Sequence, residues 1–196
     1  MRLDPFRGDG RAILGKIHLV CADIPFGLPD HPVENLSVEN VRLYFKGGGS
    51  RDDAHRQVPE WPEKYPEFDM FGQLPAYAFF VRHARNLRFS NVSVEFDQSE
   101  IRPGMSFEDV EGLDIDGVAI AGSSDGEPLI KFYQVRECLM RGCRIPWPVS
   151  TFIQVAGERS DGITITGNDL RRAQKAVDIV PNVARSAVYQ LSNRTE

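Results

Sequence analysis

The stretch Leu87-Arg88-Phe89-Ser90-Asn91-Val92 decides the fold, because its pattern returns at a fixed spacing along the chain. Apolar residues alternate with polar ones in it, and an asparagine or glycine takes the fifth place. The other four copies begin at Leu36, Leu113, Cys138 and Ile163. The first residues of successive copies are 51, 26, 25 and 25 positions apart, and 51 is two periods. An internal repeat of this length is typical of a solenoid.

The alternation within each copy predicts a β-strand with one buried and one exposed side. A second short apolar stretch precedes four of the copies, at residues 79–81, 105–107, 130–132 and 152–155. Two or three short strands per 25 residues, without helical periodicity, predict an all-β fold, a parallel β-helix built from coils of roughly 25 residues. A leucine-rich repeat would need a Leu-x-x-Leu-x-Leu frame that is absent, and a β-sandwich would not repeat in register.

The offset between copies also predicts which side chains stack. We expect one inward row of Leu87, Leu113, Cys138 and Ile163, and a second of Phe89, Ile115, Met140 and Ile165. Cys138 and Cys143 then replace core residues of the preceding coil, so we expect reduced, buried thiols. The odd count of three cysteines, without metal-ligand spacing, argues against a disulfide framework or a metal site.

One stretch, residues 46–75, does not repeat. It begins with three glycines and contains four prolines, which disfavour strands in the interior of a sheet. We expect a long loop that projects from a single domain spanning residues 1–196. Long loops in compact folds are often functional.

Charge and composition exclude several classes of function. The 196 residues include 23 Lys and Arg against 28 Asp and Glu, a net charge of -5. Nucleic-acid binding needs a cationic surface, so we expect none. Apolar runs are far shorter than the roughly 18 residues of a membrane span, and residues 1–6 lack the apolar region of a secretory signal. No cofactor is predicted.

Several motifs, in this order, resemble glycoside hydrolase family 28, in its bacterial polygalacturonase-like branch. They include Gly27-Leu28-Pro29-Asp30-His31, Lys46-Gly47-Gly48-Gly49, Tyr65-Pro66-Glu67, Met70-Phe71-Gly72 and Val81-Arg82-His83. The resemblance covers roughly residues 25–120. It implies a right-handed parallel β-helix, pectin-type polysaccharides as substrates, and a secreted or periplasmic parent protein about twice as long.

The chain departs from that family where the chemistry would be. Inversion at a glycosidic bond needs two carboxyl groups with room for a water molecule between them. The family signatures Asn-x-Asp, Asp-Asp, Gly-His-Gly and Arg-x-Lys are missing in family context. The only Asp-Asp pair, Asp52-Asp53, falls in the predicted loop. No catalytic residue is therefore assigned. We expect either a polysaccharide hydrolase related to family 28, or a carbohydrate-binding or structural β-helix module that is inactive by itself.

Candidate substrate-binding residues gather in two places. In the predicted loop they are Asp52, Asp53, His55, Glu60, Glu63 and Glu67, with the aromatic side chains Trp61, Tyr65 and Phe71. These residues would form a sugar-binding lip, or the aromatic side chains would only fix the loop to the solenoid. Four basic and six acidic residues between positions 46 and 77 favour a neutral sugar over a polyanion.

The second group is basic, with Arg82, His83, Arg85, Arg88 and Arg102. It would meet a uronate carboxylate, or it would pair with acidic residues one coil away. The repeat places Arg82 beside Glu108 and His83 beside Asp109, so we favour cross-strand ion pairs.

The N-terminal segment predicts the oligomeric state. Residues 1–16 offer little apolar cover for the end of a coil stack, and an uncovered strand edge pairs with other chains. We therefore expect a homo-oligomer formed through the N-terminal end, with a fold-back cap and a monomer as the alternative.

Overall fold

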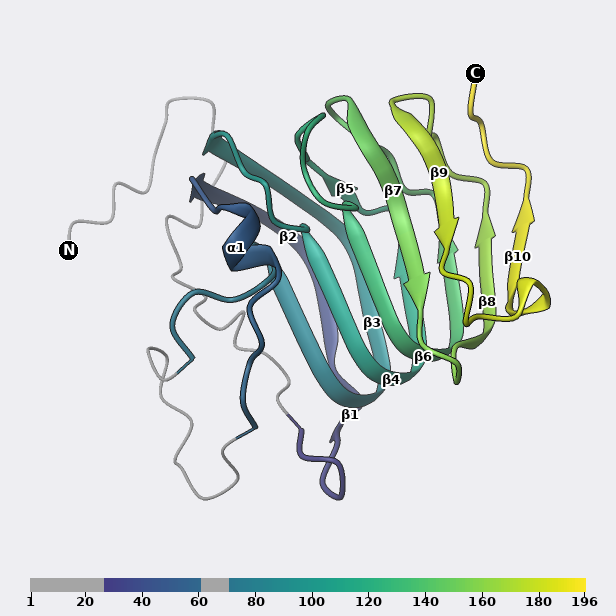
Figure 1. Ribbon diagram of the computed structural model, residues 1–196. Coiled ribbons are helices and arrows are strands. Elements are labelled where there is room, and N and C mark those ends of the chain that lie inside the picture. The colour runs from purple at the N-terminus through teal and green to yellow at the C-terminus, as the bar shows by residue number, and fades with distance from the viewer. Residues whose placement is uncertain (1–26, 61–70) are drawn as a thin grey trace.

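The computed structural model describes residues 27–60 and 71–196, and in it parallel strands stack coil upon coil into a β-solenoid (Figure 1). The elements in chain order are β1 (Val33–Glu34), β2 (Ser37–Gly47), α1 (Arg51–Ala54), β3 (Phe79–Gln98), β4 (Met105–Asp116), β5 (Ala119–Ile120), β6 (Ile130–Arg141), β7 (Val149–Ala156), β8 (Asp161–Thr166), β9 (Ala173–Ile179), the 3₁₀ turn η1 (Arg185–Ala187) and β10 (Val188–Leu191). The predicted all-β parallel β-helix with coils of about 25 residues is confirmed.

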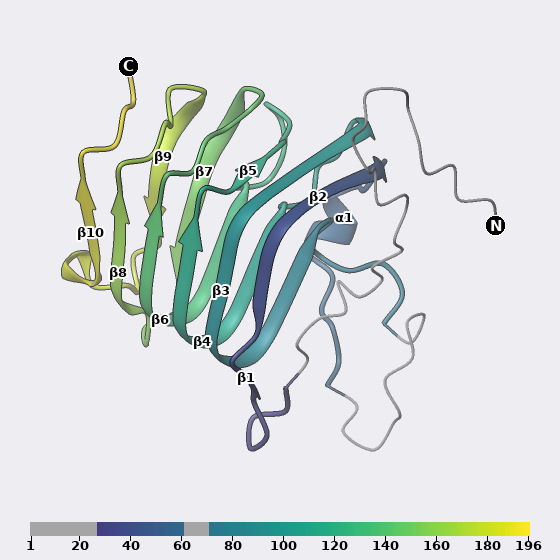
Figure 2. The ribbon, with the colours of Figure 1, turned by 180° about the vertical axis from the view of Figure 1, so that it is seen from behind.

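The coils wrap around a main apolar core. β6 shows how, because its first half pairs with β7 and its second half with β8. Seen from behind, β8 and β10 lie side by side with the second halves of β4 and β6 on one face, whereas β7 and β9 lie with the first half of β6 on the opposite face (Figures 1 and 2).

Both predicted inward rows are present. Leu87 is in register with Leu113, which is in register with Cys138, and Cys138 with Ile163. The second row, Phe89, Ile115, Met140 and Ile165, has the same register. All eight side chains are buried. Phe89, Phe107 and Phe132 continue the stacking through edge-to-face ring contacts.

The long strands bend at residues in the left-handed backbone region. Asn40, Asn91, Gly117, Gly142 and Gly167 all have φ between 52° and 65°. These are the fifth positions of the repeat, where asparagine and glycine tolerate positive φ. Asn91 also donates a side-chain hydrogen bond of 2.8 Å to Asn40 of the preceding coil.

Two further rows of positive φ were not predicted. One contains Asn35, Asn86, Gly112, Glu137 and Gly162, and the other His83, Asp109, Gln134 and Gly157. Because the chain bends at these single residues without losing its sheet pairing, the two strands expected within residues 79–92 form one strand, β3. Ion pairs line the bends, as with Arg85, which lies between Glu34 and Glu111 of the neighbouring coils.

The insertion differs from the predicted loop in two ways. β2 continues to Gly47, paired with Gln98, so its first two residues belong to the sheet. Residues 51–54 form the helical turn α1, which is capped by Ser50 and Asp53. Residues 1–26 and 61–70 lie outside the described part, so the expected N-terminal association and the roles of Trp61, Tyr65, Glu63 and Glu67 stay predictions.

Candidate functional site

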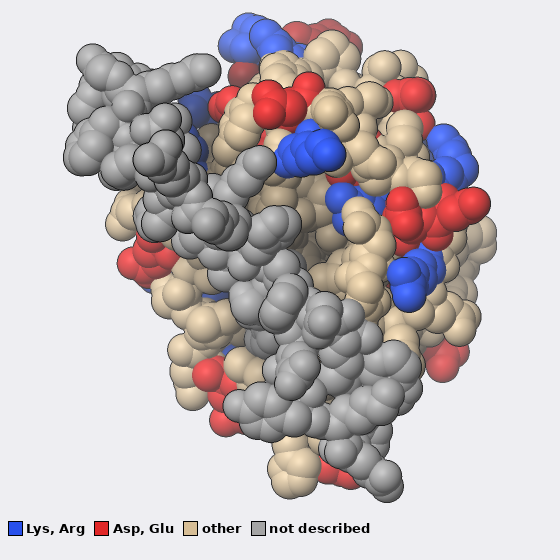
Figure 3. Space-filling model, turned by 90° about the vertical axis from the view of Figure 1, so that its left-hand side faces the viewer, with Lys and Arg blue, Asp and Glu red and all other residues tan. Residues whose placement is uncertain are grey.

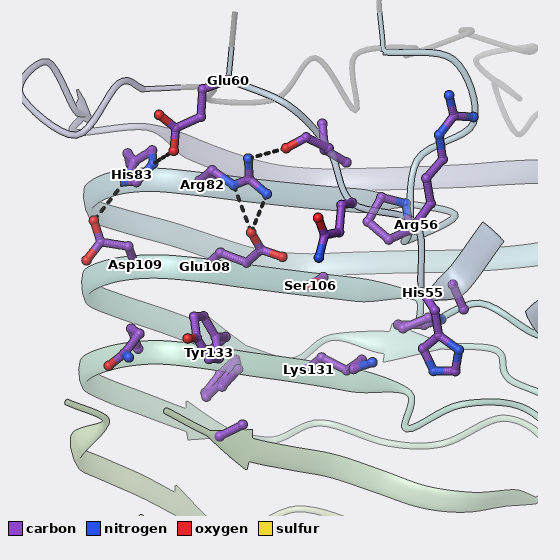
Figure 4. A pocket seen from close by; sticks show the side chains of 18 of the residues that line it. His55, Arg56, Glu60, Arg82, His83, Ser106, Glu108, Asp109, Lys131 and Tyr133 are labelled. Carbon is purple, nitrogen blue, oxygen red and sulfur yellow. Dashed lines mark hydrogen bonds and ion pairs between the residues drawn. The ribbon is translucent and has the colours of Figure 1, made fainter. Parts of the chain in front are cut away.

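A groove of about 1070 Å³ lies on the outer side of β3, β4, β6 and β7, beside residues 54–60 of the insertion (Figure 4). Its floor comes from outward positions of successive coils. Arg82, Glu108, Tyr133 and Ala156 form one row, and Ser106, Lys131 and Gln154 form the next. The groove therefore runs across the strands, from coil to coil.

One side of the groove is the wall segment, residues 55–60. Phe80 points outward from β3, yet it is fully buried because Val58, Leu74 and Ala76 cover it in a small second core. Phe71 packs against the same cluster, as expected for an aromatic residue that fixes the loop.

Arg82 ties the wall segment to the coils. Its Nη1 donates to the carbonyl oxygen of Val58 at 2.7 Å, and its guanidinium lies 5.2 Å from the centre of the Phe80 ring. Its Nε and Nη2 lie 2.7 and 2.6 Å from Oε2 of Glu108. The cross-strand pair predicted for Arg82 and Glu108 is thus present.

His83 joins three elements. Its Nδ1 lies 2.8 Å from Oδ2 of Asp109 on β4, as predicted, and its Nε2 lies 3.1 Å from Oε1 of Glu60 on the wall segment. Nη2 of Arg159 lies 3.3 Å from the other oxygen of Asp109. The side chain of His83 is 11% exposed.

Around α1, three basic side chains share one carboxylate. The side chains of Arg51, His55 and Lys131 lie 3.4, 3.3 and 3.7 Å from Glu127. Glu127 is largely buried, so it anchors the helical turn to the solenoid. His55 and Lys131 also line the groove.

Tyr133 is the most exposed large hydrophobic side chain among the described residues that line the groove, with 52% of its surface accessible. The lining of the groove also includes the amide side chains of Gln134 and Gln154 and the hydroxyl group of Ser106. Gln154 donates to Asp178 at 2.8 Å. An aromatic face beside amide and hydroxyl groups suits a ligand with both apolar and hydroxylated faces.

Asp52, Asp53 and Arg102 do not line the groove, and neither do Arg85 and Arg88 of the basic group. Asp53 accepts hydrogen bonds from the side chain and backbone of Ser50, which lowers the pKa of its carboxyl. Asp52 is exposed on α1 beside it. Arg102 is bound to the buried Glu100 at 2.8 and 2.9 Å. The expected sugar-binding role of Asp52, Asp53 and Arg102 therefore has no support in the groove's geometry, because none of them lines it. Asp53 and Arg102 instead make local contacts that stabilise the fold.

His55, Glu60, Arg82 and His83 do come together in the groove. Sequence reasoning missed Lys131, Tyr133, Gln154 and Arg159. The signal was available for two of them, since Lys131 and Tyr133 occupy the positions of Ser106 and Glu108 one coil later.

On the face seen in Figure 3, acidic and basic side chains of the described residues are intermixed. Within residues 27–60 and 71–196, no group of three or more His, Cys, Asp or Glu is placed to hold a metal ion. No helix of the same residues is long and apolar enough to cross a membrane. In comparisons with protein-family models, curated proteins and solved structures, nothing matches this chain.

Proposed function

We propose that this chain binds a polysaccharide or oligosaccharide along the groove and does not cleave it. The observation that carries the proposal is Tyr133, which lies 52% exposed on the floor of a groove that crosses successive coils. An aromatic ring offers a sugar an apolar stacking face, while the neighbouring amides and hydroxyl satisfy sugar hydroxyl groups.

The direction of the groove supports an extended ligand. Neighbouring strands are about 4.7–4.9 Å apart, so equivalent outward positions recur at that spacing. A chain of sugar units that runs across the strands therefore meets an outward-facing side chain on each successive coil. The resemblance to glycoside hydrolase family 28 points to the same class of ligand.

The charges of the groove favour a neutral or weakly charged glycan. Its lining holds four Lys and Arg residues against three Asp and Glu residues. Arg82 and Arg159 already contact Glu108 and Asp109. A polyanion would have to displace these carboxylates, which costs the pairs they form.

A pair of tyrosine variants tests this proposal. We expect Tyr133→Ala to weaken binding to a defined neutral oligosaccharide about tenfold or more, as when a central aromatic anchor is removed. Tyr189→Ala is the matched control, because Tyr189 is 59% exposed on β10, away from the groove. Calorimetric titration with neutral, rhamnogalacturonan and galacturonate oligosaccharides would measure both. Equal affinities of the two variants would contradict the proposal.

A second candidate function is hydrolysis, and one observation favours it. Glu60, Glu108 and Asp109 bring three carboxylates into the same groove. Each of them already contacts Arg82, His83 or Arg159, so each would have to leave an ion pair to act on a substrate. Release of reducing sugar that is lost in Glu108→Gln or Asp109→Asn, with the fold intact, would favour this candidate over binding alone.

A further inference from the structure

Both ring nitrogens of His83 face carboxylates that come from different parts of the chain. Asp109 belongs to β4 of the solenoid, and Glu60 belongs to the wall segment. Figure 4 shows the imidazole between the two carboxylates, beside the Arg82–Glu108 pair. His83 is the mostly buried member of the trio, since Glu60 and Asp109 are 42% and 32% exposed.

The protonation state of an imidazole decides how many of these contacts it makes. A neutral imidazole carries one N–H and one acceptor nitrogen, whereas the imidazolium donates from both nitrogens. Ionised carboxylates only accept. Glu60 and Asp109 are therefore both satisfied only when His83 is protonated.

The loss of the proton affects the two contacts unequally. Asp109 is held from its other oxygen by Arg159 at 3.3 Å, and its contact with His83 is the shorter one. A neutral His83 keeps its remaining N–H on Asp109, so its Nε2 lone pair then faces the carboxylate of Glu60. That arrangement is repulsive.

We propose that protonation of His83 attaches the end of the wall segment to the solenoid, and that its deprotonation releases Glu60 from the groove. An effect of this release on ligand affinity rests on the proposed glycan-binding function, whereas the release itself does not. Histidine is the side chain whose charge ordinarily changes between about pH 5 and 8.

Other charged groups surround His83 and set the background for this switch. Arg82 and Glu108 flank it in the groove, and on its far side a small hollow is lined by Arg85, Glu111, Arg136 and Arg159. Most of them are paired, Arg82 with Glu108 and Arg136 with Glu111 at 3.0 Å. Arginine keeps its charge throughout the range, so its contribution does not change with pH.

Backbone ¹⁵N relaxation of the whole chain between pH 5.5 and 8 tests the proposal. We expect the order parameter of the Glu60 amide to fall from about 0.85 toward 0.6 as the pH rises. Val58 should stay ordered, because Arg82 holds its carbonyl oxygen. The imidazole signals of His83 should follow the same transition.

Three variants make the test specific. Glu60→Gln offers an amide N–H to the free nitrogen of a neutral imidazole. The order parameter of residue 60 should therefore stay high at every pH in this variant. His83→Asn tolerates the positive φ of 50° and should leave residue 60 mobile throughout. His55→Gln removes the histidine that belongs to the wall segment itself and lies near Glu127, and it should leave the transition unchanged.

A Glu60 order parameter that does not change with pH in the unmodified chain, or a transition that survives in His83→Asn, would overturn the proposal. Oligosaccharide affinity measured at both pH values is a separate readout. If no glycan binds but the Glu60 transition is present, the proposed function fails and the switch stands. If a glycan binds and Glu60 shows no transition, the switch fails and the function stands.

Discussion

Arg82 of β3 and Glu108 of β4 are 26 positions apart in the chain, and their side chains meet at 2.6 Å on the outside of adjacent coils. The same guanidinium donates to the carbonyl oxygen of Val58. One side chain thus connects two coils with the segment that walls the groove. The coil register and the placement of the wall depend on each other at this point.

Replacement of Arg82 should therefore loosen the wall segment. Arg82→Ala removes charge-assisted hydrogen bonds to Glu108 and Val58, and we expect a loss of about 1.5–3 kcal/mol in the free energy of unfolding. Phe80 should become accessible, since Val58 no longer covers it. Urea denaturation and amide exchange around residue 80 would measure both effects.

Arg85→Ala is the matched control for this variant. Arg85 is 53% exposed and lies 3.6 and 3.9 Å from its two partners, and exposed pairs contribute only about 0.2–1 kcal/mol. Similar losses for the two variants would contradict the role given to Arg82.

The inward row that contains Ile115 should be sensitive to truncation of its side chains. Ile115 is fully buried between Phe89 and Met140. Ile115→Ala leaves a cavity that the stacked coils cannot close, so we expect a loss of about 2–5 kcal/mol in unfolding free energy. A loss below 1 kcal/mol in chemical denaturation would show that the coils repack freely.

The positive φ at the fifth position of the repeat predicts which substitution of Gly167 destabilises the protein more. Gly167 has φ of 63°, and a Cβ there would meet no atom within 4 Å, so only backbone strain is at issue. Gly167→Ala should cost about 1–2 kcal/mol. Gly167→Asn should stay within about 0.5 kcal/mol of the unmodified chain, because asparagine occupies this position in two other coils. Thermal denaturation of the two variants would check this order, and the reverse order would refute it.

The two described cysteines should resist alkylation in the folded protein. Burial raises the pKa of Cys143 to about 12 and raises that of Cys138 further, again by burial. The thiolate is the reactive form, so both thiols stay protonated and inert at pH 8. In a Cys21→Ser background, an Ellman titration should detect no thiol before denaturation and two thiols after it. Rapid labelling of the native protein would contradict the burial of these two thiols.

The chain should release no reducing sugar from pectin, rhamnogalacturonan or neutral glycans. Asp52 and Asp53 lie on α1 outside the groove, and Asp53 caps that helical turn. Hydrolysis that disappears in Asp52→Asn or Asp53→Asn would show this prediction wrong, and it would place the active site at α1.

The coil register could be predicted from the sequence because a repeat of fixed length aligns every position with its equivalent. Cys138 and Arg82 were placed correctly in this way, since the partner of each is one period away. The wall segment could not be predicted, because its contacts with Phe80 and His83 are not repeated in any other coil. The register places Tyr133 on the same outward row as Arg82 and Glu108. Nothing in the repeat marks it as an exposed aromatic residue, because its equivalents there are arginine and glutamate.

The most direct test of the glycan-binding groove is chemical-shift mapping of the ¹⁵N-labelled chain titrated with a neutral oligosaccharide. We expect saturable shifts that centre on Tyr133 and extend to Ser106, Lys131 and Gln154, with none on β8 or β10. Shifts that centre on β8 and β10, or no saturable shifts with any glycan tested, would contradict the assignment of the groove as a carbohydrate-binding site.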